Sequence, residues 1–244
     1  MNKKVLKYIW ILILFIALHI SKIFAQQCYI YEGQRWQTGL VTYHINGNLG
    51  NAFATQEEYE FAIFTAAQTW NYAGANFEFI RGTNVYYARG EEPAGVFQVG
   101  KDYEFGGPLG WTDLDFNGSN EIIKACSYFN DYQFWSIDPD FTEYDIQSFI
   151  LHEFGHWLRL LDETDYACQE NVMYLGLYPG DTKRNLTQDD KNEIGFIYGQ
   201  NPVAPLLINP LSSFFNRDHS FFEHDPDVLI YSRIILLLAE PVML

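Results

Sequence analysis

Two histidines and a glutamate in the second half of the chain have the types and spacing that metal-assisted hydrolysis requires. His152 and His156 are four residues apart, so on a helix they project from one face, one turn apart. Their imidazoles can therefore share one zinc ion. Glu153 follows the first histidine and can act as general base toward a water molecule that zinc makes acidic. The stretch predicts a helical zinc site that attacks a polarised carbonyl group.

A catalytic zinc site needs three protein ligands and one open position, so two histidines are too few. Residues 152–162 read HEFGHWLRLLD, which resembles the metzincin peptidases, whose motif is HExxHxxGxxH or, in some bacterial members, HExxHxxGxxD. The resemblance implies Asp162 as the third ligand. Arg159 stands where that family has a glycine, whose left-handed backbone turns the chain back toward the metal. Glu163 and, in a gluzincin-like arrangement, Glu170 are alternative ligands.

A methionine downstream of the histidines extends the resemblance. Metzincins carry a methionine-containing turn beneath the metal, and Met173 follows at a suitable interval. Tyr174 directly after it, and the sequence over 186–199, resemble the matrixin branch. The family implies an α+β fold with a twisted mixed sheet, three helices and a zinc cleft. It also implies a specificity pocket lined by residues 174–177 and an edge strand near 127–129 that binds the substrate backbone.

Hydrophobic periodicity and capping signals predict the elements that position these residues. A capping box precedes a predicted helix over 56–72, and two further helices are predicted over 145–158 and 187–198. Residues rich in glycine, proline, asparagine and aspartate over 82–120 predict mostly loop. The predicted strands cover 40–45, 77–81, a short piece near 95–99, and 121–129.

The chain is expected to have four parts. Residues 1–25 combine early lysines with an apolar run that is short for a bilayer span, which is typical of a secretory signal peptide; an uncleaved membrane anchor is the alternative. An N-terminal segment over 26–37 precedes the metallopeptidase domain, which we expect over 38–200. Residues 201–244, which prolines interrupt, are expected to be a C-terminal tail of unknown role. The predicted location is outside the cell, or the periplasm if the source is a Gram-negative bacterium.

The charge balance narrows the class of partner. The chain has 31 acidic and 15 basic residues and a formal net charge of −16. Removal of residues 1–25 would take away four lysines and no acid, which lowers the charge by four to −20. Such a surface disfavours nucleic acid and anionic membranes as partners. We expect a monomeric protein with a polypeptide substrate and no stable membrane association after the signal has been removed.

Cysteines and one acidic stretch give further expectations. In an oxidising compartment one disulfide and one free thiol are expected among three cysteines, with Cys126–Cys168 favoured over a pair that includes Cys28. Residues 113–118 resemble the first half of a calcium loop, but its twelfth position is Lys124, where a calcium loop needs glutamate. An Asp/Asn turn between strands is therefore favoured over a Ca²⁺ site.

The sequence thus predicts a secreted zinc-dependent endopeptidase in which Glu153 activates the zinc-bound water. The alternative is a catalytically impaired zinc-containing domain that binds or interacts, suggested by Arg159 and by the unusual tail. A purely structural zinc site has no need of a general base, so Glu153 favours the enzyme.

Overall fold

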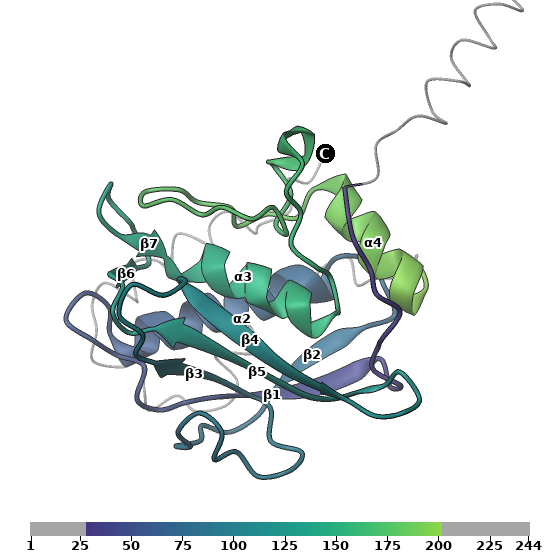
Figure 1. Cartoon of the computed structure of the whole chain (residues 1–244), viewed down its shortest axis with the longest axis horizontal. Helices are drawn as coiled ribbons and strands as arrows, with labels where there is room; N and C mark the ends of the chain where they lie inside the picture. Colours follow the sequence, from purple (N-terminus) through teal and green to yellow (C-terminus); the bar gives the residue numbers. More distant parts are fainter. Residues whose placement is uncertain (1–27, 202–244) are drawn as a thin grey trace, which may run out of the picture. The chain divides into compact units, whose positions relative to one another are not determined.

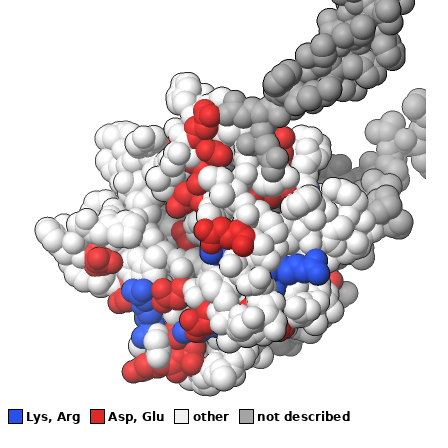
Figure 2. Space-filling view, turned by 45° about the vertical axis from the view of Figure 1, so that its right-hand side comes forward, with Lys and Arg blue, Asp and Glu red and all other residues white. Residues whose placement is uncertain are grey.

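The computed structural model describes residues 28–201. The signal peptide predicted over 1–25, and all but the first residue of the predicted tail, lie outside the described residues. Within residues 28–201, none of the helices combines the length and the apolar character needed to cross a membrane. On the face drawn in Figure 2, acidic side chains are spread widely, with fewer basic ones between them.

A five-stranded mixed sheet forms the base of the described chain, with its strands in the order β2–β1–β3–β5–β4 (Figure 1). Every neighbouring pair is parallel except β4 and β5, which are antiparallel, so β4 is an edge strand. A short two-stranded pair, β6 with β7, leads into helix α3. The strands are β1 (Leu40–Ile45), β2 (Glu78–Arg81), β3 (Gln98–Asp102), β4 (Gly110–Phe116), β5 (Ile122–Asn130), β6 (Trp135–Ser136) and β7 (Tyr144–Asp145).

Within the described residues, three α-helices accompany the sheet, and α2 and α3 lie against the same face of it (Figure 1). Each helix begins where a polar side chain accepts a hydrogen bond from a backbone N–H of the first turn; the three capping residues are Thr55, Asp145 and Thr187. The predicted helices are confirmed to within one residue at each end, and so is the α+β class. The helices are α2 (Gln56–Asn71), α3 (Ile146–Trp157) and α4 (Gln188–Tyr198), with a 3₁₀ turn η1 (Tyr166–Cys168) after α3.

The core lies between the sheet and the helices and fixes the position of α3. Alternate residues of β1 point into it, and Tyr43 packs edge-on against Phe154 of α3 with ring centroids 5.4 Å apart. Phe79 of β2 stacks on Phe154 at 4.7 Å. Indole Nε1 of Trp70 on α2 donates to the Leu151 carbonyl of α3 at 2.8 Å. Each buried aromatic side chain contributes about 1.5–3 kcal/mol, so α3 is held firmly.

The prediction that residues 127–129 lie in an edge strand is wrong. They belong to β5, which lies between β3 and β4, and β4 occupies the edge. In the region 82–120, predicted as mostly loop, the short strand predicted near 95–99 is found shifted as β3, and β4 was not predicted. The β4 sequence GWTDLDF includes two aspartates, which are rare in strands, and an edge strand tolerates them because one side is not covered by another strand.

The predicted Cys126–Cys168 disulfide is also wrong, because the bonded pair is Cys28–Cys168, with Cα atoms 5.5 Å apart. Cys126 is a free thiol buried within β5. The N-terminal segment runs beside the loop that follows α3, where the Leu161 N–H donates to the Ile30 carbonyl at 3.0 Å. That path brings Cys28 to η1, and the spacing of the cysteines contains no information about it.

Candidate metal centre

Helix α3 carries His152 and His156 one turn apart, with ring centroids 4.8 Å apart and planes at 88°. Nδ1 of His152 lies 2.9 Å from the Val172 carbonyl, and Nδ1 of His156 lies 2.8 Å from the Leu160 carbonyl. A carbonyl oxygen can only accept a hydrogen bond, so each Nδ1 carries a proton. In its neutral form, a ring held this way presents the lone pair of Nε2 as a potential metal ligand.

The chain reverses direction at the end of α3 through a left-handed residue. Arg159 has a φ of 70°, its N–H donates to the His156 carbonyl at 2.9 Å, and the Leu160 N–H donates to the Gly155 carbonyl at 3.1 Å. This hydrogen-bond pattern is the one that a left-handed residue gives after a helix. The turn expected from the resemblance is thus present, although a non-glycine residue in this conformation costs about 1–2 kcal/mol.

Three contacts of the Arg159 side chain oppose that strain. The guanidinium donates to Gln34 Oε1 at 2.8 Å and forms an ion pair with Glu32. Its central carbon also lies 4.9 Å from the ring centroid of Phe116, at the end of β4. Arg159 therefore ties the loop after α3 (residues 158–173, the metal loop) to residues 28–36, which we name the strap.

The metal loop brings Asp162 to the two histidines. Asp162 Oδ1 lies 3.1 Å from Nε2 of His152 and 3.6 Å from Nε2 of His156, and the three ligand atoms lie within 4.8 Å of one another. The neighbouring Glu163 is directed elsewhere, because its carboxylate accepts the N–H groups of residues 164 and 165 at 2.7 Å each. Neither Glu163 nor Glu170 belongs to this group.

The donor set of this group fits a zinc ion. Both Nε2 atoms carry lone pairs, and Asp162 Oδ1 is buried and makes no hydrogen bond of acceptable geometry. Three acceptors this close repel one another unless a cation or a proton lies between them. Zinc bonds of about 2.0–2.1 Å in a tetrahedron place ligand atoms about 3.4 Å apart, and the two Asp162 distances bracket that value.

Without a cation, the same groups perturb one another's protonation. Burial lowers the pKa of His152, but the contact with Asp162 and the charge of Glu153 outweigh it, so that the pKa of His152 is raised. The contact with His152 lowers the pKa of Asp162 despite partial burial of that carboxyl group. The group thus favours positive charge at its centre.

Glu153 faces the same cavity from α3 and is 4% exposed. Its Oε2 accepts a hydrogen bond from the Thr112 hydroxyl of β4 at 2.5 Å. The cavity has a volume of ≈ 620 Å³, and its walls include residues 108–112 and residues 174–177. The first wall runs into the edge strand β4, and the second is irregular.

Met173 lies beneath the group, against the buried side of α3. It is 1% exposed, and a Cβ atom added to Gly155 would lie 2.1 Å from its sulfur. Only glycine at position 155 therefore lets the helix approach the methionine this closely. The Met173 carbonyl accepts the Glu163 N–H at 2.8 Å, which joins this turn to the residue after Asp162.

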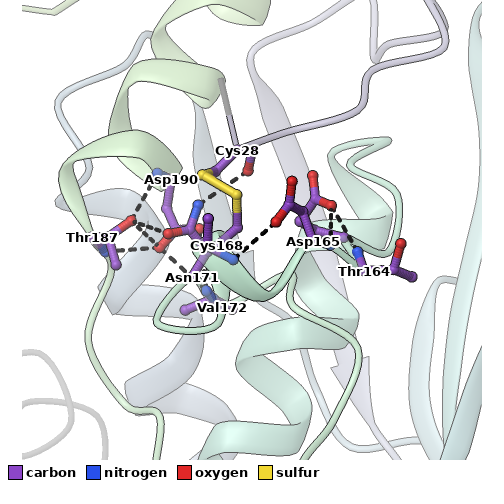
Figure 3. The surroundings of a disulfide bond; sticks show 10 residues. Cys28, Thr164, Asp165, Cys168, Asn171, Val172, Thr187 and Asp190 are labelled. Atoms are coloured by element: carbon purple, nitrogen blue, oxygen red, sulfur yellow. Dashed lines mark hydrogen bonds between the residues drawn. A yellow bond between two sulfur atoms is a disulfide. The ribbon is translucent and has the colours of Figure 1, made fainter. Parts of the chain in front are cut away.

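The disulfide and α4 hold the metal loop from outside (Figure 3). Asn171 Nδ2 donates to the Cys28 carbonyl at 3.0 Å, next to the Cys28–Cys168 bond. The Val172 N–H donates to the Asp190 carboxylate of α4, with distances of 3.2 and 3.3 Å to its two oxygens. Sequence reasoning missed this support, because residues 28–36 have no helical or strand periodicity that would reveal it.

The stretch compared with a calcium loop forms part of a hairpin. Asp113 and Asp115 lie on β4, opposite Cys126 and Lys124 of β5. The Asp113 carboxylate accepts two hydrogen bonds from Arg89, each of 3.0 Å, so a guanidinium occupies its oxygens. A turn over 117–121 follows β4, as the Asp/Asn pattern suggested.

Known proteins resemble parts of this chain. It is 32% identical to Metalloendoproteinase 1 of Glycine max over 109 residues, which cover 42% of this chain and 33% of that protein. It is 35% identical to Interstitial collagenase of Bos taurus over 86 residues, which cover 34% and 17% of the two proteins. Matrix metalloproteinase-25 of Homo sapiens is 23% identical over 184 residues, 72% and 32% of the two lengths.

The matched segments span a third or less of the length of these three relatives. A model of the matrixin family matches residues 35–199, from the end of the strap through α4. The match covers both walls of the cavity, α3, the metal loop and Met173. With more than half of its length matched, this chain belongs to the matrixin family.

Proposed function

We propose that this chain is an exported zinc-dependent endopeptidase. The observation that carries the proposal is the convergence of His152, His156 and Asp162 at one cavity, with the Glu153 carboxylate facing the same space. The matched relatives include proteins named metalloendoproteinase and collagenase, which supports peptide-bond hydrolysis as the reaction. Asp162 is the proposed third ligand, and Met173 supports the group from below.

A zinc ion held by these three side chains would lower the pKa of a bound water molecule and polarise the scissile carbonyl. Glu153 is the general base in this proposal. Its Oε2 is occupied by the Thr112 hydroxyl, so Oε1 is the oxygen that takes the proton of the attacking water. The same carboxyl group then delivers that proton to the amine that leaves.

The edge strand β4 is the proposed binding site for the substrate backbone. Its inner side pairs with β5, and its outer side borders the cavity with N–H and C=O groups that a further strand can pair with. An extended polypeptide on this edge would pass between β4 and residues 174–177. The apolar side chains of Leu109, Leu175 and Leu177 line this passage, which favours an apolar substrate side chain there.

Export is supported by the disulfide. A Cys28–Cys168 bond persists in an oxidising compartment and is rare in a reducing one. We therefore retain the location outside the cell or in the periplasm, with residues 1–25 as the signal peptide. N-terminal sequencing of protein recovered outside the cytoplasm tests this, because it should begin near residue 26.

The activity is tested with zinc-loaded protein and a broad peptide library. We expect internal cleavage that a chelator abolishes and that added zinc restores. Glu153→Ala should remove cleavage while zinc content and the unfolding midpoint stay near those of the wild type. Glu163→Gln serves as a matched control and should retain cleavage, because an amide oxygen can still accept the two N–H groups. Wild-type protein that binds zinc but cleaves no peptide would contradict the proposal and favour a non-catalytic zinc domain.

A further inference from the structure

A chain of four side chains runs from the core of the protein to the Glu153 carboxylate. Indole Nε1 of Trp157 donates to Ser127 Oγ at 2.7 Å, and Ser127 Oγ lies 2.6 Å from Thr112 Oγ1. Thr112 Oγ1 in turn lies 2.5 Å from Glu153 Oε2. Trp157 and Ser127 are fully buried, and Glu153 is nearly so.

The direction of every hydrogen bond in this chain is fixed by its two ends. An indole N–H can only donate, and the carboxylate of a general base can only accept. The single hydroxyl proton of Thr112 therefore goes to Glu153, and that of Ser127 goes to Thr112. Each hydroxyl donates once and accepts once, so neither has a further proton to donate.

The same four residues close a ring between α3 and the sheet. Glu153 and Trp157 lie one turn apart on α3, while Thr112 of β4 and Ser127 of β5 are directly paired across the hairpin. The ring therefore connects the helix that carries the base to the edge strand proposed to bind substrate. A fully satisfied buried network of this kind holds its members in one arrangement.

We propose that Thr112 and Ser127 are positioning residues for the general base, an inference that rests on the proposed function. By occupying Oε2, Thr112 leaves Oε1 directed at the cavity and fixes the rotation of the carboxylate. Ser127 and Trp157 orient the Thr112 hydroxyl so that its proton points to Glu153. The ring also fixes the distance between the base and the β4 backbone, so the attacking water and the substrate carbonyl are positioned against one rigid frame.

Thr112→Val tests this, because valine keeps the shape of the side chain and removes the hydroxyl. We expect kcat on a peptide substrate to fall about 10–100-fold, with KM and zinc content within about twofold of the wild type. Thr112→Ser should restore kcat to within about threefold. Ser127→Ala should give a smaller loss than Thr112→Val, since the Thr112 hydroxyl remains but is no longer oriented.

Thr69→Val is the matched control, because the Thr69 hydroxyl is also partly buried but bonds a helix carbonyl of α2 at 2.9 Å, outside this ring. It should leave kcat unchanged. The inference is overturned if Thr112→Val raises KM at constant kcat, releases zinc, or behaves like Thr69→Val.

A second measurement needs no catalysis. A short peptide hydroxamate binds zinc and shares the proton of its hydroxyl group with the general base, so its Kd for zinc-loaded protein reports the position of Glu153. We expect Thr112→Val to weaken binding about tenfold, Thr112→Ser to restore it, and Glu153→Ala to weaken it further. Unchanged binding by Thr112→Val would overturn the inference. If the variants show this pattern of Kd values but the wild type cleaves no peptide, the proposed function fails while the positioning role stands.

Discussion

Helix α3 and the metal loop supply the same metal group by different physical means. On α3, the spacing of His152 and His156 follows from regular helical geometry, and the helix is fixed by aromatic packing against the sheet. The metal loop has no such regularity, yet it contributes Asp162 and the two carbonyls that orient both histidines. The loop therefore depends on outside restraints from the strap, the disulfide and α4. The position of Asp162 and the orientation of both histidines are thus tied to contacts that lie far from them in sequence.

Removal of the disulfide should produce the largest effect, and it should act on the loop. Cys28→Ser with Cys168→Ser releases a ring with a sequence separation of 140 residues, and we expect a loss of about 4–5 kcal/mol in the free energy of unfolding. Urea denaturation of the metal-free protein measures it. Cys126→Ser is the control for removal of a buried cysteine outside the bond. An equal loss of unfolding free energy in Cys126→Ser and in the double variant would mean that the disulfide is not what supports the loop.

Asp162→Ala should come next, because it removes the proposed ligand of the loop while leaving the two proposed ligands of the helix. We expect zinc affinity, measured by competition with a chromophoric chelator, to fall at least about 100-fold, which exceeds the effect of most changes outside the ligand shell. Helical content should be unchanged by circular dichroism. Retained affinity in Asp162→Ala would move the third ligand elsewhere in the loop, with Glu163 the first residue to examine.

Helix α4, which holds the metal loop from outside, carries a group that should make stability depend on pH. Burial, with Asp190, Asp189 and Glu163 adding to it, raises the pKa of Glu193 from 4.5 to about 9, and its carboxyl oxygens have no hydrogen-bond partner. The folded protein therefore keeps a proton that the unfolded chain releases above pH 4.5, so the stability that this group contributes is lost as pH rises toward 9.

Glu193→Gln should remove this loss. Between pH 5 and pH 7, its free energy of unfolding should fall by about 2 kcal/mol less than that of the wild type. Urea midpoints at the two pH values measure it. Glu57→Gln, on the exposed surface of α2, is the control and should leave the difference between the two pH values as in the wild type. A parallel pH dependence in wild type and Glu193→Gln would show that Glu193 is not its source.

The smallest effect concerns the junction of helix and loop. Arg159→Gly and Arg159→Ala both remove the guanidinium contacts, but only glycine relieves the strain of a φ of 70°. We expect the glycine variant to be more stable than the alanine variant by about 1 kcal/mol, measured by thermal unfolding. If alanine is equally stable, the backbone at this position is not strained, and the contacts with Glu32 and Gln34 have another purpose.

The helical half was predictable from the sequence because its determinants are local. Capping residues and apolar spacing predicted all three helices to within one residue, and β1 as observed. The roles of His152, Glu153, His156 and Asp162 stay predictions that the proposed experiments test. Asp162 itself was expected only through the resemblance to metzincins, because nothing in residues 158–162 predicts where the chain turns.

The remainder could not be predicted because it depends on contacts between distant parts of the chain. β4 was missed because Arg89 binds the carboxylate of Asp113 and because the strand lies at the edge of the sheet, and neither is a local property. The disulfide was mispaired because the sequence positions of three cysteines do not show which two lie close together in the fold. No sequence pattern joined Thr112 and Ser127 to Glu153, because the two residues are paired only through the β4–β5 register, which the sequence does not reveal.

The 140-residue separation of Cys28 and Cys168 also has a consequence for the order of assembly. The sheet, α2 and α3 all lie between these cysteines in sequence, so most of the described chain must be synthesised and brought together before the bond can close. Long-range contacts of this kind form late in folding. We therefore expect a newly made chain in a reducing compartment to have its histidine helix before it has a fixed third ligand. Under the proposed function, competence to retain zinc would then arise when the chain reaches an oxidising environment, which would separate its synthesis from its first opportunity to cut a peptide.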